Sequence, residues 1–196
     1  DKSLSILIVE DEGLVAANLA DKLEQMGYEV VGTAVDGREA VETALRLRPG
    51  LILMDIQLEG PMDGIQAVEA IRGRYDVPVI YLTAHSDPAT LARAKRTGAF
   101  GYIIKPFEIR DLATQIELSL YKHQASRQLA ESEERYRRLL EVMPVAMCTC
   151  DAGGRITYFN EYAVKIWGRA PAEGDTVEGF SAPYRLYQPD GSPLPL

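Results

Sequence analysis

Four short apolar stretches of this chain end in polar side chains that could carry chemistry, namely Glu10-Asp11, Asp55, Thr83 and Lys105. Carboxylates that share one site repel one another, so at least one of them requires a cation or a proton. Oxygen ligands in an open site suit Mg²⁺, which takes one or two carboxylates and keeps several waters. A carboxylate can also attack phosphorus as a nucleophile, and a lysine ammonium and a hydroxyl group can then stabilise the phosphoryl oxygens. The set therefore points to phosphoryl transfer at a magnesium site.

Each of these residues also has an ordinary structural interpretation. Asp11 could cap a helix, Thr83 could be a turn hydroxyl, and Lys105 could be a surface lysine beside a loop proline. These separate explanations would have to coincide at every one of the strand ends. We therefore favour a single shared site over a set of unrelated turn residues.

The elements that must position these residues can be predicted from the apolar pattern. Residues 51–55 hold four consecutive apolar positions before Asp55, which is typical of a strand buried on both faces. Further strands are expected at residues 5–9, 28–34, 77–82 and 100–104. Apolar residues at helical spacing separate them, so we predict an α/β fold with a parallel sheet and right-handed crossovers. The carboxyl ends of such strands open onto one crevice, where ligands bind.

Composition limits the classes of function. The chain has 196 residues, enough for one domain and part of another, and a net charge of −8 that disfavours a nucleic-acid surface. Its two cysteines, Cys148 and Cys150, are too close in the sequence to cross-link a domain by a disulfide. No apolar run is long enough to span a membrane. We therefore expect a cytoplasmic protein that binds neither nucleic acid nor membrane.

The helical pattern that starts at Glu108 continues to about Met143, far beyond an ordinary helix. Its apolar stripe has mixed three- and four-residue spacing and consists of Leu118, Ala125, Leu129, Ser132, Tyr136, Leu139 and Met143. This stripe predicts a connector helix over residues 108–143 that pairs with its copy in a homodimer as a coiled coil. The charged run 131–138 is equally typical of a solvated helix face.

The last part of the chain predicts a small, incomplete unit. Residues 145–159 have the pattern of a hairpin with a turn at 151–154, and Asn160 is placed to cap a short helix. No closing strand follows. Two strands and one helix bury too little surface to stand alone, so we expect pairing with another chain or a loosely ordered tail.

The strand-end motifs resemble those of response-regulator receiver domains. They are Ile-Leu-Ile-Val-Glu10-Asp11-Glu, Leu-Met-Asp55-Ile, Leu-Thr83-Ala84 and Tyr102-Ile-Ile-Lys105-Pro106-Phe. The resemblance covers residues 4–121 and implies a receiver domain over 1–121. It also implies a flavodoxin-like, doubly wound sheet of five parallel strands in the order 2-1-3-4-5.

The resemblance implies a role for each residue at the phosphoryl site. Asp55 would be the phosphoacceptor, and Thr83 and Lys105 would hold the phosphoryl group. Ala84 and Pro106 would line the phosphoryl pocket, and Tyr102 would act with Thr83 as the family's switch. The Lys105-Pro106 bond would be cis.

The resemblance also implies a set of ligands for Mg²⁺. Asp11 would bind the ion directly and Glu10 would bind it through water. Asp55 would also belong to the metal site, and the main-chain carbonyl of Gln57 would complete the protein ligands. Glu10 stands where the family more often has Asp.

A second resemblance concerns residues 144–196. The run Met-Cys-Thr-Cys-Asp-Ala-Gly-Gly-Arg-Ile-Thr-Tyr-Phe-Asn160 is similar to the start of a PAS sensor domain, so these residues would form a partial PAS domain. Receiver, helical linker and PAS in this order resemble the amino-terminal part of a hybrid sensor histidine kinase. The phosphodonor would then be a histidine kinase or a phosphotransfer protein. The chain itself would not be an enzyme, because it has no kinase catalytic region.

The same residues could also serve two other functions. A receiver-like scaffold would dimerise without being phosphorylated, although the complete set of Asp11, Asp55, Thr83 and Lys105 argues against loss of the chemistry. A phosphatase with an aspartate nucleophile would need a second Asp two residues after Asp55, and position 57 is Gln.

Overall fold

A computed structural model describes residues 3–84 and 88–177 of the chain. The chain divides into two compact units, Asp1–Arg127 and Gln128–Leu196. Among the described residues, none of the helices combines the length and the hydropathy that crossing a membrane requires.

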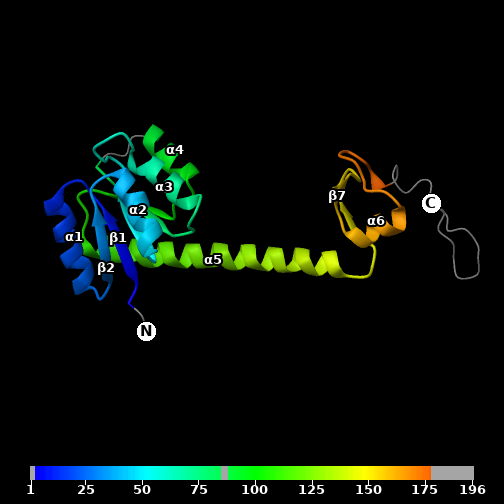
Figure 1. The fold of residues 1–196 in the computed structure, drawn as a ribbon, viewed down its shortest axis with the longest axis horizontal. Helices are drawn as coiled ribbons and strands as arrows, with labels where there is room; N and C mark the ends of the chain where they lie inside the picture. The colour runs from blue at the N-terminus through cyan, green and yellow to red at the C-terminus, as the bar shows by residue number, and fades with distance from the viewer. Residues whose placement is uncertain (1–2, 85–87, 178–196) are drawn as a thin grey trace, which may run out of the picture. The chain divides into compact units, whose positions relative to one another are not determined.

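The first unit is built on a parallel sheet of five strands (Figure 1). The strands are β1 (Ser5–Val9), β2 (Glu29–Ala34), β3 (Leu51–Asp55), β4 (Val79–Thr83) and β5 (Gly101–Ile104). Their spatial order is β2-β1-β3-β4-β5, which confirms the predicted flavodoxin-like topology. β3 lies in the middle of the sheet, so the strand with the most continuous apolar run is also the most enclosed.

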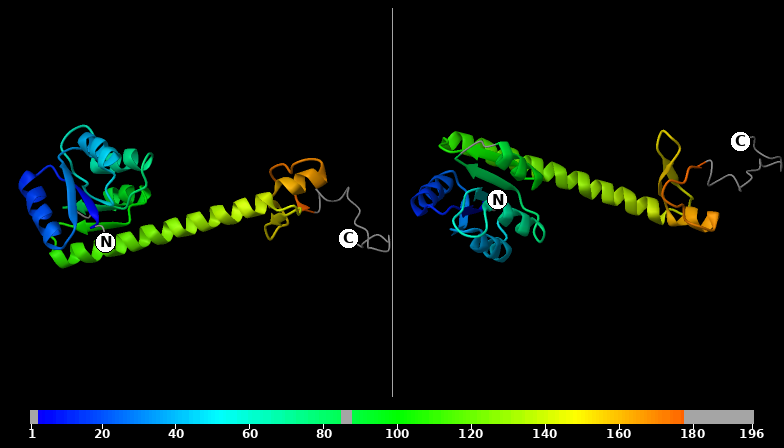
Figure 2. Two further views of the ribbon diagram at one scale, coloured as in Figure 1. Left: turned by 60° about the horizontal axis from the view of Figure 1, so that its bottom comes forward. Right: turned by 90° about the horizontal axis from the view of Figure 1, so that it is seen from above.

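Helices cover both faces of this sheet (Figure 2). They are α1 (Gly13–Gln25), α2 (Gly37–Leu47), α3 (Gly64–Arg72), α4 (Pro88–Arg96) and the first turns of α5 (Ile109–Val142). One core forms between the sheet and α2, α3 and α4, and the other forms between the sheet and α1 and α5. Successive side chains of a strand point to opposite faces, so Ile52 and Met54 enter the first core whereas Leu51 and Leu53 enter the second.

Polar caps start the helices that follow β2 and β3. The Asp36 side chain accepts hydrogen bonds from the backbone N–H groups of Arg38 and Glu39 at the start of α2. At the start of α3, Asp63 and Gln66 form a reciprocal capping box. These caps fix where each helix begins and therefore how the preceding loop leaves the edge of the sheet.

The 34-residue helix α5 changes character along its length. Leu112, Ile116 and Ser119 are buried against the five-stranded sheet. Further along, the predicted stripe faces solvent, and Leu129 is 62% exposed. The predicted helix at 108–143 is therefore confirmed to within one residue at each end, while the pairing of its stripe stays a prediction.

The second unit contains the predicted hairpin and short helix. Strands β6 (Cys148–Cys150) and β7 (Ile156–Phe159) pair antiparallel, and α6 (Glu161–Trp167) follows. Asn160 is buried, and its side-chain oxygen caps α6 by accepting a hydrogen bond from Ala163 N. Its side-chain nitrogen donates two further hydrogen bonds, to Leu140 O and to Val145 O. One polar side chain thus ties the start of α6 to the end of α5 and to the chain before the hairpin.

The chain after α6 returns to the hairpin, which the sequence did not predict. Ile156 N donates to Asp175 O and Val177 N donates to Gly154 O, around an isolated bridge between Arg155 and Thr176. Residues 178–196 lie outside the described part of the chain, so the prediction that this unit is incomplete stays open.

The contact between Gly64 and β3 gives a stability prediction. A Cβ atom at Gly64 would lie 1.9 Å from the main-chain oxygen of Asp55, so no side chain fits there. Gly64→Ala should lower the free energy of unfolding by at least about 2 kcal/mol in chemical denaturation, because the helix or the strand must shift.

Gly13→Ala is the matched control. A Cβ atom at Gly13, also the first residue of a helix, would meet nothing within 4 Å. This variant should be neutral or more stable by up to about 1 kcal/mol. Equal effects of the two substitutions would contradict the close packing of α3 on β3.

Candidate functional site

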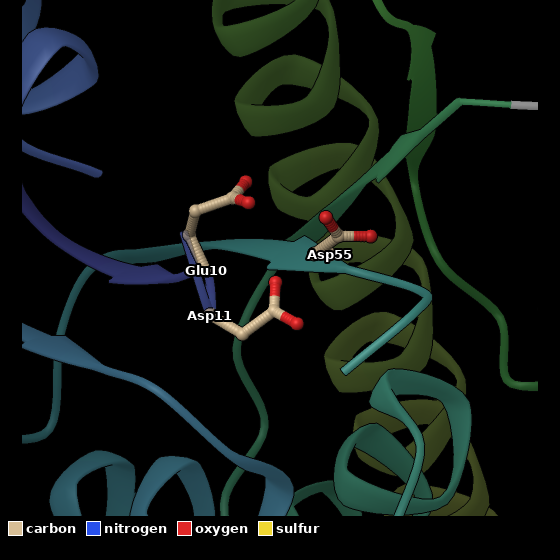
Figure 3. Close-up of side chains that lie close together, drawn as sticks. All are labelled: Glu10, Asp11 and Asp55. Atoms are coloured by element: carbon tan, nitrogen blue, oxygen red, sulfur yellow. The ribbon is translucent and has the colours of Figure 1, made fainter. Parts of the chain in front are cut away.

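Three carboxylates converge at the carboxyl edge of the sheet (Figure 3). Glu10 and Asp11 come directly after β1, and Asp55 is the last residue of the neighbouring strand β3. Each offers an oxygen, and these oxygens lie within 4.8 Å of one another. Glu10 and Asp55 are only 1% and 6% exposed, so this negative charge is largely removed from water.

The Lys105 side chain partly neutralises this cluster. Its Nζ donates to Oε2 of Glu10 and to Oδ2 of Asp55, each at 2.6 Å. The other oxygen of Asp55 accepts a hydrogen bond from the backbone N–H of Gln57 at 2.9 Å. One ammonium therefore faces three carboxylates, and negative charge is in excess.

Burial and ion pairing shift the pKa values of two groups. Burial raises the pKa of the Glu10 carboxyl group, and the charge of Asp55 raises it further, although the hydrogen bond from Lys105 opposes both. Burial alone would lower the pKa of Lys105, but its hydrogen bonds to Asp55 and Glu10 outweigh this effect and raise it. Lys105 therefore stabilises the fold throughout the neutral range, and this contribution is lost only as the pH rises through its raised pKa.

The raised pKa of Glu10 has the opposite consequence near neutral pH. A carboxyl group with a higher pKa in the folded chain stabilises the fold below its unfolded value of about 4.5. That stabilisation is lost as the pH rises through the raised pKa. Ionised Glu10 is thus a cost to the fold unless another positive charge approaches it.

The donor set fits a hard divalent cation. Glu10 Oε1 is buried and has no hydrogen-bond partner within residues 3–84 and 88–177. A cation beside Glu10, Asp11 and Asp55 would give this oxygen a partner and would offset the excess negative charge. Carboxylate oxygens in a site with room for water are the ligands that Mg²⁺ prefers.

The other predicted site residues lie on β4, on β5 and on the segments that follow them. Thr83 is buried at the end of β4, its main-chain oxygen accepts a hydrogen bond from Lys105 N at 2.7 Å, and Ala84 follows it at the surface. The Lys105-Pro106 peptide is cis, as predicted. Tyr102 lies on β5 and is 47% exposed.

Two features of the site were not predicted from the sequence. The direct ion pair between Glu10 and Lys105 joins residues 95 positions apart, and no local pattern indicates it. The packing of Gly64 against Asp55 was also missed. No local sequence pattern indicates how close Gly64 lies to the phosphoacceptor candidate.

Comparison with known proteins gives the family. The family model of the response regulator receiver domain matches residues 6–117. The chain belongs to this family. A PAS domain model matches residues 134–192, so the order receiver, helix and PAS predicted from the motifs is confirmed. The chain is therefore a receiver-containing protein of the two-component signalling type.

One curated relative is the transcriptional regulatory protein PdtaR of Mycobacterium tuberculosis. It is 44% identical over 115 residues, which are 59% of this chain and 56% of PdtaR. The chain spans about half the length of the curated relatives it matches.

Solved structures of receiver domains are similar over the same part of the chain. One is the N-terminal domain of a response regulator/sensory box/GGDEF three-domain protein from Carboxydothermus hydrogenoformans. It has 39% sequence identity and a TM-score of 0.58, and the match covers 62% of this chain and 98% of that one. Another is the receiver domain of sensor histidine kinase PA1611 from Pseudomonas aeruginosa PAO1, solved with a magnesium ion in its active-site cleft. It has 31% identity and a TM-score of 0.56, covering 61% of this chain and 98% of its own.

The electrostatics of the cluster predict how magnesium affects stability. At a concentration ten times its dissociation constant, Mg²⁺ should stabilise the fold by about 1.4 kcal/mol, or roughly 4 °C in the thermal midpoint. The shift should be larger at about pH 7.5 than at about pH 5, because the raised pKa of Glu10 leaves more of it protonated in acid.

A charge-matched pair of variants tests this interpretation. Asp11→Asn should remove most of the magnesium-dependent shift, whereas Asp21→Asn, on the exposed face of α1, should retain it. A shift that is independent of pH and of Asp11 would place the ion elsewhere.

Proposed function

We propose that Asp55 accepts a phosphoryl group from a histidine kinase or a phosphotransfer protein in the presence of Mg²⁺. The observation that carries this proposal is the convergence of Glu10, Asp11 and Asp55 with the Lys105 ammonium, which is hydrogen-bonded to the candidate phosphoacceptor. Receiver-family membership supports it, and so does the magnesium ion in the cleft of the PA1611 receiver domain.

The transfer is a displacement at phosphorus. A carboxylate oxygen of Asp55 attacks the phosphorus atom, and an aspartyl phosphate forms as the bond to the donor breaks. The donor leaves with the electron pair of that bond, which is a P–N bond for a phosphohistidine and a P–O bond for acetyl phosphate. The Gln57 N–H bond to Asp55 Oδ1 and the Lys105 bond to Oδ2 hold the carboxylate in place before attack.

Charge neutralisation is the main contribution of the remaining residues. Glu10, Asp11, Asp55 and the main-chain carbonyl of Gln57 would hold Mg²⁺, which would neutralise charge on the phosphoryl oxygens. Lys105 would exchange its contact with the Asp55 carboxylate for one with a phosphoryl oxygen. Thr83 would donate its hydroxyl hydrogen to another, and Ala84 and Pro106 would line the pocket.

We further propose that Thr83 and Tyr102 form the switch. Movement of Thr83 toward the phosphoryl group would open space beside β4. Tyr102, which is half-exposed in this structure, could then turn inward. Because Tyr102 lies on the strand that leads into Lys105 and α5, this change would alter the face formed by β5 and its two flanking helices.

The connector helix would carry this change to the PAS unit. We propose that residues 1–121 form the receiver, 108–143 the fifth helix and connector, and 144–196 the PAS unit. The solvent-facing stripe of α5 would pair with the same stripe of a second copy, since its members recur at seven-residue intervals at 118, 125, 132 and 139 and at 129, 136 and 143.

The phosphoacceptor can be tested directly. Treatment with acetyl phosphate and Mg²⁺ should add one phosphoryl group, and intact-mass spectrometry should detect it. Asp55→Asn should abolish the label, because the carboxylate nucleophile is lost, and chelation of the metal should reduce it strongly.

Asp21→Asn is the control for loss of one negative charge and should be labelled as the unmodified protein is. Labelling that persists in Asp55→Asn would refute the assignment. Steady release of phosphate from phosphate esters would favour the phosphatase alternative, and complete absence of labelling would favour the scaffold.

The dimer can be tested by sedimentation at tens of micromolar, with and without beryllofluoride as a phosphoryl mimic. Leu129→Glu should shift the protein toward monomer, because it places charge on the predicted seam. Gln124→Glu adds the same charge on the opposite side of α5 and should leave the association unchanged. A protein that remains monomeric in every state would exclude dimerisation through the connector.

A further inference from the structure

The amino end of α3 is a junction between two segments that border the phosphorylation site. Asp63, the cap of α3, uses both of its carboxylate oxygens. Oδ1 accepts a hydrogen bond from Gln66 N at 2.8 Å, and Oδ2 accepts one from Nη2 of Arg93 at 2.8 Å. Arg93 lies on α4, so one carboxylate both starts α3 and binds the neighbouring helix.

On one side, this junction is fixed to the phosphoacceptor strand. Gly64 N donates to Ile56 O at 3.0 Å. The Gly64 backbone also lies so close to the main-chain oxygen of Asp55 that a Cβ atom would be 1.9 Å from it. The amino end of α3 therefore cannot move toward β3, and Asp63 stays in place relative to Asp55.

On the other side, the junction is connected to the segment that follows Thr83. α4 begins at Pro88, the fifth residue after Thr83, and Arg93 lies in its second turn. Movement of Thr83 toward a phosphoryl group on Asp55 would shift the start of α4. Because Asp63 cannot follow, the distance between Arg93 and Asp63 would have to change.

We propose that Arg93 and Asp63 are positioning residues for phosphorylation. Their ion pair holds α4 in the place that it occupies in the unphosphorylated chain, and this pair opens when Thr83 closes on the phosphoryl group. The pair thus restrains phosphorylation of Asp55 and sets how readily the receiver responds to a donor. This inference rests on the proposed function, because it concerns the response of the same site.

The exposure of the pair limits the size of the effect. The side chains of Arg93 and Asp63 are 49% and 33% exposed, so water and salt screen their interaction. Loss of an exposed ion pair of this kind should therefore change a rate or an equilibrium by about two- to fivefold. A larger change would require a contact other than this one.

The test measures the rate at which acetyl phosphate labels Asp55 at fixed Mg²⁺, followed by intact-mass spectrometry. Arg93→Ala and Asp63→Asn should each raise this rate about two- to fivefold. Asn caps a helix as well as Asp does, so Asp63→Asn removes the ion pair while it keeps the start of α3. Arg93→Lys keeps the positive charge and should be closer to the unmodified protein, whereas Arg96→Ala, at the end of the same helix, should have no effect.

Two further readouts separate this role from a structural one. The double variant Arg93→Ala, Asp63→Asn should be no faster than either single variant, since both remove the same interaction. The difference from the unmodified protein should shrink at about 1 M salt, while the magnesium-dependent shift in the thermal midpoint stays unchanged.

Unchanged or slower labelling in the single variants would overturn the inference, and so would additive effects in the double variant. In either case, labelling of the unmodified protein would leave the proposed function intact. Absence of labelling in the unmodified protein would instead refute the proposed function and this inference with it.

Discussion

The site depends on one electrostatic constraint, the burial of two carboxylates beside a single ammonium. Glu10 and Asp55 are held together, against their mutual repulsion, by Lys105 at 2.6 Å from each. This arrangement requires β1 and β3 to be neighbours in the sheet. It also requires Lys105, which follows β5, to lie at the same edge of the sheet. The remaining negative charge and the unpartnered Glu10 Oε1 leave the site electrostatically unbalanced with the described protein atoms alone. A divalent cation is the ligand that such an excess of negative charge favours.

The two helices beside the site, α3 and α4, differ in how closely they are held to it. The backbone of Gly64 lies so close to Asp55 that no side chain could be inserted, so the start of α3 packs directly on the end of β3. Arg93, in contrast, reaches the same junction only by a solvent-exposed side chain. The proposed phosphoryl transfer would need both properties, a fixed nucleophile and a neighbouring segment that can move at small cost.

Much of the fold could be predicted from local patterns. The four apolar residues before Asp55 predicted a strand enclosed on both faces, and β3 indeed contributes side chains to both cores. The start of β2 and both ends of α5, as predicted from turn residues and helical spacing, differ from the observed ones by one residue each. The pairing of Thr176 beside β7 was not predictable in this way, because a single-residue bridge leaves no periodic pattern in the sequence.

The sequence by itself determined the α/β class and the gathering of four polar strand ends at one edge, because parallel strands with helical crossovers allow no other arrangement. The receiver motifs then implied a role for each of those residues. Only the tertiary structure decided that Glu10 bonds directly to Lys105, that Gly64 packs on Asp55, and that Tyr102 lies half-exposed. The Glu10–Lys105 bond joins residues 95 positions apart, and the other two features depend on how neighbouring elements pack. They depend on small differences in how closely packed elements approach one another, and neither spacing nor composition encodes such differences.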